Sequence, residues 1–213
     1  SVCRTPWQQL WIEWVSLEHL SLHVADEPEL MEEVFGALEA VQEETFKAVA
    51  ELAQELPIPY VIFPDNITAP AIGPGYFRRS CLPAYERLAD LLAETGRDIP
   101  VGVHMDGDLK PLAKDIAESP VRLLDSFSPP PDNDTSAAEA VSLWPDMRLG
   151  LNFPSSVHTR SPEIVRSAIE EILLEEAGHS GRLQIQISEN TPPGRWKVTA
   201  PILADAIERF GQP

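Results

Sequence analysis

The feature that most constrains this chain is an alternation of short apolar runs and helical patterns that begins after Pro57. Strands that alternate with helices in this way build βαβ units, which require a parallel sheet. The apolar runs are YVIF (60–63), VGVH (101–104), RLLDSF (122–127), RLGLNF (148–153) and LQIQI (183–187), and the helical patterns lie at about 75–95, 109–118, 136–144, 162–177 and 199–210.

The segment before these units does not show the alternation of strands and helices. Residues 27–56 show apolar side chains at steps of three and four, which predicts one long amphipathic helix with Asp26 as its N-cap and Pro28 in its first turn. We expect residues 1–56 to be a helical segment that packs on a partial barrel formed by residues 57–213, in one structural domain. The predicted buried face is Leu30, Val34, Leu38, Val41, Val49, Leu52 and Leu56, with Trp7, Trp11 and Trp14 packed nearby.

Polar side chains cluster where the predicted strands end. Parallel α/β folds bind ligands at that edge of the sheet. No Gly-x-Gly-x-x-Gly turn or Walker-type loop follows a strand, so a nucleotide-binding sheet is disfavoured. The pattern therefore predicts an α/β fold of the (β/α)8 TIM-barrel type, of which this chain supplies five βα units. Either further strands belong upstream of Ser1, or the barrel is reduced and a partner covers its open edge.

The net charge of the chain limits the kinds of partner that it can bind. The formal net charge is −18, with 34 acidic against 16 basic residues, which disfavours nucleic acid and anionic membrane surfaces. No apolar run approaches the roughly 20 residues that span a bilayer. Cys3 and Cys81 form neither a disulfide framework nor a spaced zinc motif. We expect a cytoplasmic protein with reduced thiols, a small-molecule substrate and a homodimeric assembly.

The segment VGVHMDGD, residues 101–108, carries the first candidate site. Residues i and i+2 of an extended segment point to the same face, so His104 and Asp106 can both reach a barrel mouth. With Glu189, after the last strand, they would make a three-ligand metal site with an open position. The alternative is a polar loop in which His104 caps a strand end and Asp108 is the N-cap of the next helix.

Other strand ends carry further candidates. Asp65 and Asn66 follow YVIFP directly, where they would accept a proton or position a substrate, or close the strand as an Asx turn. Asn152 is a substrate-binding candidate or a turn former. Ser126 lies at the end of its strand, and His158 lies in a loop from which it could reach the mouth. We therefore expect Asp65, His104 and Asp106 to be catalytic and the other four residues to bind substrate.

Three segments resemble the uroporphyrinogen decarboxylase superfamily. They are residues 28–52 (PELMEEVFGALEAVQEETFKAVAEL) with the following VIFPDN, residues 73–108 (GPGYFRRSCLPAYERLADLLAETGRDIPVGVHMDGD), and residues 190–211 (NTPPGRWKVTAPILADAIERFG). Their order and spacing resemble the family's helix before an acidic strand end, its helix and strand ending in His and Gly, and its terminal pattern. The resemblance implies a (β/α)8 barrel whose remaining strands lie upstream of Ser1.

The resemblance also suggests a reaction. In the cobalamin-linked methyltransferase branch, zinc is held by a His-x-Cys pair and a later Cys. His104 matches that His, Asp106 stands where the first Cys would be, and Glu189 falls near the second. Carboxylates in place of thiolates imply a harder site that is less suited to activating a thiol. The implied cofactors are zinc or another divalent metal and a corrinoid on a partner protein.

The decarboxylase branch is the alternative within the family. It relies on N-terminal arginines and an Asp outside this chain, and on a late His-Gly segment where residues 188–196 read SENTPPGRW. The leading prediction is therefore a methyltransferase-like enzyme, followed by a decarboxylase. A barrel that binds a ligand without catalysis is the third possibility.

Overall fold

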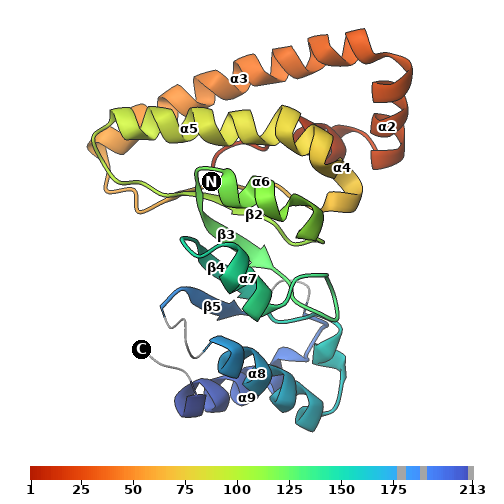
Figure 1. Cartoon of the computed structure of the whole chain (residues 1–213), viewed down its shortest axis with the longest axis vertical. Helices are drawn as coiled ribbons and strands as arrows, with labels where there is room; N and C mark the ends of the chain where they lie inside the picture. Colours follow the sequence, from red (N-terminus) through yellow and green to blue (C-terminus); the bar gives the residue numbers. More distant parts are fainter. Residues whose placement is uncertain (177–180, 188–190, 211–213) are drawn as a thin grey trace.

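The computed structural model describes residues 1–176, 181–187 and 191–210, and in them five parallel strands form one sheet. The strands follow the chain order across the sheet, and each pairs with the next through a parallel register. This confirms the predicted βα alternation and is consistent with part of a (β/α)8 barrel (Figure 1). The strands are β1 (Val61–Phe63), β2 (Val101–His104), β3 (Val121–Phe127), β4 (Arg148–Asn152) and β5 (Leu183–Gln186).

Helices connect the strands, and their bounds lie close to the predicted ones. The predicted helix at 75–95 is divided by a π-helical turn into the end of one helix, the turn itself and a second helix. The first of these helices is kinked at Gly73, which adopts φ 65° just before Pro74. The α-helices are α1 (Pro6–Gln9), α2 (Leu17–Asp26), α3 (Pro28–Glu55), α4 (Ala69–Tyr76), α5 (Leu82–Glu94), α6 (Ala113–Glu118), α7 (Ala137–Leu143), α8 (Pro162–Glu176) and α9 (Trp196–Phe210). The π-helical turns are η1 (Leu10–Trp14) and η2 (Phe77–Cys81), and the 3-10 turns are η3 (Lys110–Leu112) and η4 (Val157–Thr159).

The predicted buried face of α3 is confirmed only in part: Val34, Leu38 and Val49 pack against the core, but the other four predicted residues are exposed. Leu30 is 55% exposed, Val41 67% and Leu52 50%, whereas Phe35 and Phe46 are buried at 1% exposure each. The helix carries two apolar stripes next to each other, and the one with the aromatic rings packs against the sheet and α5, where Phe46 meets Phe63 edge-to-face. Periodicity indicates that an apolar stripe exists, but only packing decides which of two stripes is covered.

Two predicted N-caps and one predicted core residue are also wrong. Asp26 is the last residue of α2, and Glu27 occupies the N-cap position of α3. Asp108 does not cap the segment after it, because the Asp134 carboxylate accepts the backbone N–H of Leu109 at 2.9 Å instead. Trp14 is 58% exposed, whereas Trp7 lies in the core as expected.

The N-terminal residues lie beside the first strand. The backbone N–H of Val2 donates to the carbonyl of Ile62 in β1 at 2.9 Å, so the chain start runs along this edge of the sheet. At the other end of the molecule α8 and α9 pack together next to β5 (Figure 1). Within the described ranges, no helix is both long and apolar enough to cross a lipid bilayer.

Candidate functional site

One face of the sheet borders a cavity of about 970 Å³. Its walls include Ile62 of β1, Leu123 and Asp125 of β3, and Gln186 of β5. The cavity also extends to the amino ends of the strands, where Arg122 and Arg148 line it. Gly150 of β4 lies between β3 and β5, and a Cβ there would come within 3.2 Å of Asp125 Oδ1 and 3.3 Å of Gln186 Nε2. The glycine therefore leaves the space in which Asp125 and Gln186 meet across β4.

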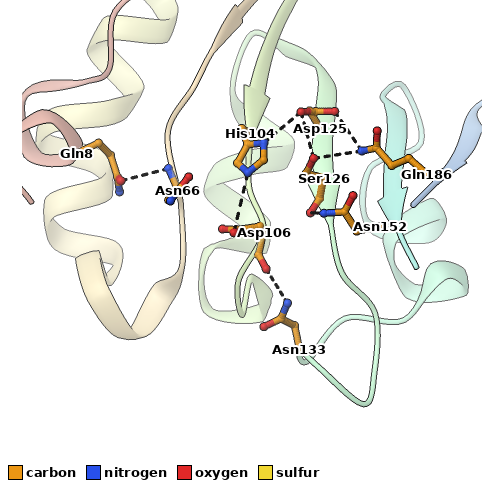
Figure 2. Close-up of polar contacts among 9 residues, drawn as sticks. All are labelled: Gln8, Asn66, His104, Asp106, Asp125, Ser126, Asn133, Asn152 and Gln186. Atoms are coloured by element: carbon orange, nitrogen blue, oxygen red, sulfur yellow. Dashed lines mark hydrogen bonds and ion pairs between the residues drawn. The ribbon is translucent and has the colours of Figure 1, made fainter. Parts of the chain in front are cut away.

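His104 ends β2 and is held between two carboxylates (Figure 2). Its Nδ1 lies 3.1 Å from Asp125 Oδ2, and its Nε2 lies 3.9 Å from Asp106 Oδ2. The hydrogen bond with His104 is the main reason why the pKa of Asp125 lies below its usual range, against the opposing effect of partial burial. A lowered pKa keeps this carboxylate ionised and able to fix the imidazole's orientation.

Gln186 and Ser126 form hydrogen bonds with the Asp125 carboxylate and hold it in place. Gln186 Nε2 donates to Asp125 Oδ1 at 3.3 Å and to Ser126 Oγ at 3.1 Å, and Ser126 Oγ donates to Asp125 Oδ2 at 3.2 Å. Both carboxylate oxygens of Asp125 are therefore occupied, one of them by His104 as well (Figure 2). Such a fully bonded carboxylate gives the imidazole one preferred position.

Ser126 also shapes the backbone at the strand end. It has φ 65°, in the left-handed region that non-glycine residues seldom adopt, and the register between β3 and β4 shifts around it. The buried Asn152 of β4 donates Nδ2 to the Ser126 carbonyl at 3.1 Å. Asn152 Oδ1 is also buried and finds no hydrogen-bond partner among the described residues. The predicted substrate-binding residues Ser126 and Asn152 are thus brought together.

The loop after β2 packs tightly on the loop after β1. A Cβ on Gly107 would lie 2.1 Å from Thr68 Cβ, so only glycine fits. Thr68 Oγ1 accepts the backbone N–H of Asp108 at 3.2 Å, and Asn133 Nδ2 donates to the Asp106 carbonyl at 2.6 Å. These contacts fix the backbone of Asp106 beside His104, which explains the glycine in HMDGD.

Asn66 lies apart from the network around His104 (Figure 2). Its backbone N–H donates to the side-chain Oε1 of Gln8 at 3.2 Å. Gln8 is fully buried, and within the described ranges its Nε2 has no hydrogen-bond partner. The N-terminal segment therefore positions the backbone of Asn66, while its predicted role in substrate binding stays a prediction.

Asp65 follows the end of β1 by two residues and is fully buried. Its carboxylate accepts the Thr5 backbone N–H at 2.9 Å, the Thr5 hydroxyl at 3.0 Å and the Tyr85 hydroxyl at 3.0 Å. Burial raises the pKa of Asp65 to about 6, against the opposing effect of these three donors. The residue ties the N-terminal segment to β1 and α5, and its predicted catalytic role stays a prediction.

His158 is also fully buried, in η4. Its Nδ1 lies 2.8 Å from Thr199 Oγ1 of α9, its Nε2 lies 3.3 Å from Thr191 Oγ1, and its ring meets Phe153 edge-to-face. Burial and the nearby Arg195 guanidinium lower its pKa. The contacts show a residue that joins the β4 loop to α9, and its predicted role in substrate binding stays a prediction.

The structure describes two of the three predicted metal ligands. His104 and Asp106 lie close together, while Glu189 falls outside the described residues. In the part of the chain that the structure describes, no group of three or more His, Cys, Asp or Glu side chains is arranged to hold a metal ion. The buried Cys81 lies beside Thr5, in the Asp65 cluster rather than beside His104.

Sequence reasoning missed three residues that organise the site. Asp125 was visible as a strand-end residue, and its place on the neighbouring strand could have indicated contact with His104. Gln186 has the same strand-end position, but glutamine in a strand carries no specific sequence pattern. Gln8 comes from the N-terminal segment, 58 residues before Asn66, so only tertiary structure brings it to β1.

Comparison with known proteins points to one family. A family profile described as uroporphyrinogen decarboxylase (URO-D) matches residues 20–200, which is most of the chain. No curated protein matches significantly.

Proposed function

The chain belongs to the uroporphyrinogen decarboxylase family, and from that membership we propose that it is an enzyme of methyl transfer. The reaction takes place where the strands end, around His104, on a small-molecule substrate. A methylated corrinoid on a partner protein, or another small methyl donor, supplies the methyl group. One observation carries the proposal: the imidazole of His104 is fixed by Asp125 on one side and faces Asp106 on the other.

A divalent metal fits this pair of side chains in part. Metal-binding histidines commonly give their second ring nitrogen to a carboxylate, which is what Nδ1 of His104 does with Asp125. Nε2 and the Asp106 carboxylate would then be two ligands, and Glu189 the third. A bound metal would supply Lewis acidity toward the methyl acceptor. Carboxylate ligands suit an oxygen or nitrogen acceptor better than a thiol, so the thiol chemistry of a Cys-ligated zinc is not part of the proposal.

The chain's own residues have defined tasks in this proposal. Asp125 keeps His104 in one orientation, and Gln186 and Ser126 keep Asp125 in place. Asn152 and Asn66 stand at the strand ends where they can bind the substrate. Such positioning contributes because a misplaced acceptor loses most of the advantage of being bound next to the donor.

Decarboxylation is the second candidate, favoured by the same carboxylate–imidazole pair. A histidine held by a carboxylate can donate a proton to the carbon that loses CO₂ or accept one from a neighbouring group. In this reaction the C–C bond electrons remain on carbon, and the proton from His104 takes the place of the carboxyl group. Before this transfer, Asp106 would stabilise the protonated imidazole that donates the proton.

Metal analysis of the purified protein tests the leading proposal without an activity assay. We expect about one divalent ion per chain, lost in His104→Ala and retained in His23→Ala, since His23 is exposed on α2 away from this site. Equal metal content in the two variants would refute the site. Content below about a tenth of an equivalent in wild-type protein loaded with Zn²⁺ or Co²⁺ would refute metal assistance.

Substrate assays separate the two reactions. Methyl transfer predicts a change in the methylcob(III)alamin absorption spectrum when the protein and a candidate acceptor are mixed, and this change should need His104. Release of CO₂ from carboxylated substrates, again dependent on His104, would replace the leading proposal with decarboxylation. Tight ligand binding without turnover, unaffected by His104→Ala, would refute both and indicate a barrel that binds without catalysis.

A further inference from the structure

The outer side of α3 carries an apolar stripe that the described part of the protein leaves exposed. We call Leu30, Ala37, Val41, Ala48 and Leu52 the outer stripe; all five are exposed, and Val41 is 67% exposed. Their steps of seven and four residues add up to eleven, a repeat that keeps side chains on one face of a nearly straight helix. The helix has 28 residues and is therefore about 42 Å long. Figure 1 shows α3 along the outer edge of the molecule.

The covered side of α3 shows what kind of neighbour this helix accepts. There Phe35 and Phe46 are buried, and the acidic residues beside them are paired with arginines. Arg79 of η2 contacts Glu32 at 2.5 Å and Glu39 at 3.0 Å. Arg87 of α5 contacts Glu43 at 2.7 Å, in a two-pronged arrangement. The neighbour of this side thus combines apolar packing with guanidinium groups.

The outer side repeats this composition without the arginines. Glu33, Glu44 and Glu51, which we call the acidic edge, are exposed beside the outer stripe. Glu44 pairs with Lys47 of the same helix at 2.8 Å. In the described residues Glu33 and Glu51 form no ion pair. An apolar stripe beside a row of carboxylates is complementary to an apolar stripe beside a row of cations.

We propose that the outer stripe docks an α-helix that has an apolar face flanked by Lys or Arg. Alanines at two of the five positions allow a helix to approach closely, as in ordinary helix packing at 8–10 Å. A second copy of the same helix is a poor occupant. Because carboxylates lie along the whole length of α3 and Lys47 is its one basic residue, self-pairing in either direction brings carboxylates together.

Two helical peptides of about 28 residues, each titrated with the full chain, test whether the docked helix must carry basic residues beside its apolar face. Both carry Leu and Ala at steps of seven and four, one with Lys and the other with Glu at the flanking positions. Fluorescence anisotropy should give a Kd for the Lys-flanked peptide at least about tenfold lower than for the Glu-flanked one. Equal affinities, or no binding of the Lys-flanked peptide, would overturn the proposal.

Variants locate the binding on α3. The double variant Val41→Gln/Leu52→Gln should weaken the Lys-flanked peptide at least about fivefold. The control Ile164→Gln/Leu174→Gln, which changes two exposed apolar residues of α8, should leave it unchanged. Glu33→Lys/Glu51→Lys should shift the preference toward the Glu-flanked peptide. An equal loss in the α8 control would show general stickiness and refute the site.

Self-association is the remaining outcome. Sedimentation velocity across protein concentrations should show no dimer that depends on Val41 and Leu52. A dimer that the Val41→Gln/Leu52→Gln variant abolishes would show that a second copy occupies the outer stripe. That result would overturn the proposed basic partner.

Discussion

Asp65 and Asp125 occupy equivalent places, one after β1 and the other at the end of β3, yet they are opposite in character. Asp65 is fully buried, accepts three hydrogen bonds from neutral donors, and has its pKa raised to about 6 by burial. Asp125 is partly exposed at the cavity and has its pKa lowered by the His104 imidazole. A strand-end carboxylate is thus not a site by position alone, because its partners and its access to solvent decide its chemistry.

The two carboxylates also belong to clusters that we expect to have different roles, one in stability and one in function. The Asp65 cluster joins the N-terminal segment, β1 and α5, with Tyr85 packed on Phe63 and Phe77. The Asp125 cluster joins β2, β3 and β5 at an open cavity and holds a single titratable imidazole. The first cluster should therefore affect folding, and the second should affect function.

Asp65→Ala should have the largest effect. It leaves the Thr5 N–H, the Thr5 hydroxyl and the Tyr85 hydroxyl without their acceptor, so the free energy of unfolding should fall by about 2–4 kcal/mol. Urea denaturation measures it. Asp125→Ala, at a partly exposed position, should cost less than about 1 kcal/mol in the same experiment. Equal losses in the two variants would remove the contrast between the clusters.

The pH dependence of stability should follow the pKa of Asp65. A folded pKa of about 6, above the unfolded value of 3.8, means that the folded state binds the proton more tightly. The contribution is fully present below pH 3.8 and is lost as the pH rises through about 6. Relative to Asp65→Asn, the wild type should gain on the order of 1–3 kcal/mol in unfolding free energy between pH 7 and pH 4. A difference that shrinks on acidification would show that the three hydrogen bonds outweigh burial.

Asp125→Asn should lower function with little change in stability. The amide no longer holds the imidazole as a carboxylate does, so metal affinity, or turnover once a substrate is known, should fall about 10–100-fold. Isothermal titration with Zn²⁺ or Co²⁺ measures the affinity, with urea denaturation as the folding control. Unchanged affinity and turnover would mean that Asp125 does not position His104 for function.

Among these variants, Gly150→Ala should have the smallest effect on metal affinity. Its Cβ would come within 3.2 Å of Asp125 Oδ1 and 3.3 Å of Gln186 Nε2, so the two side chains must separate by a few tenths of an ångström. We expect a stability loss of about 1 kcal/mol and a metal affinity intermediate between wild type and Asp125→Asn. Thermal denaturation together with the same titration checks both. Wild-type affinity in this variant would show that the Asp125–Gln186 contact is dispensable.

The strands and most helices could be predicted because their causes are local. Apolar runs such as VGVH and helix starts such as Pro162 depend on neighbours within a few residues. The placing of His104 beside Asp106 follows likewise from alternation along an extended segment. The long-range partners could not be predicted in the same way, because Gln186 lies 61 residues from Asp125 and Gln8 lies 58 residues from Asn66.

By itself, the sequence determined the βα alternation, the family, and the histidine and carboxylate at the end of β2. Tertiary structure alone decided that Asp65 is buried, that Asp125 holds His104, and that α3 covers one of its two apolar stripes and exposes the other. The physical reason is the range of the forces involved. Backbone hydrogen bonds and periodicity act between near neighbours, whereas burial and electrostatic partnership depend on segments that meet only when the chain has folded.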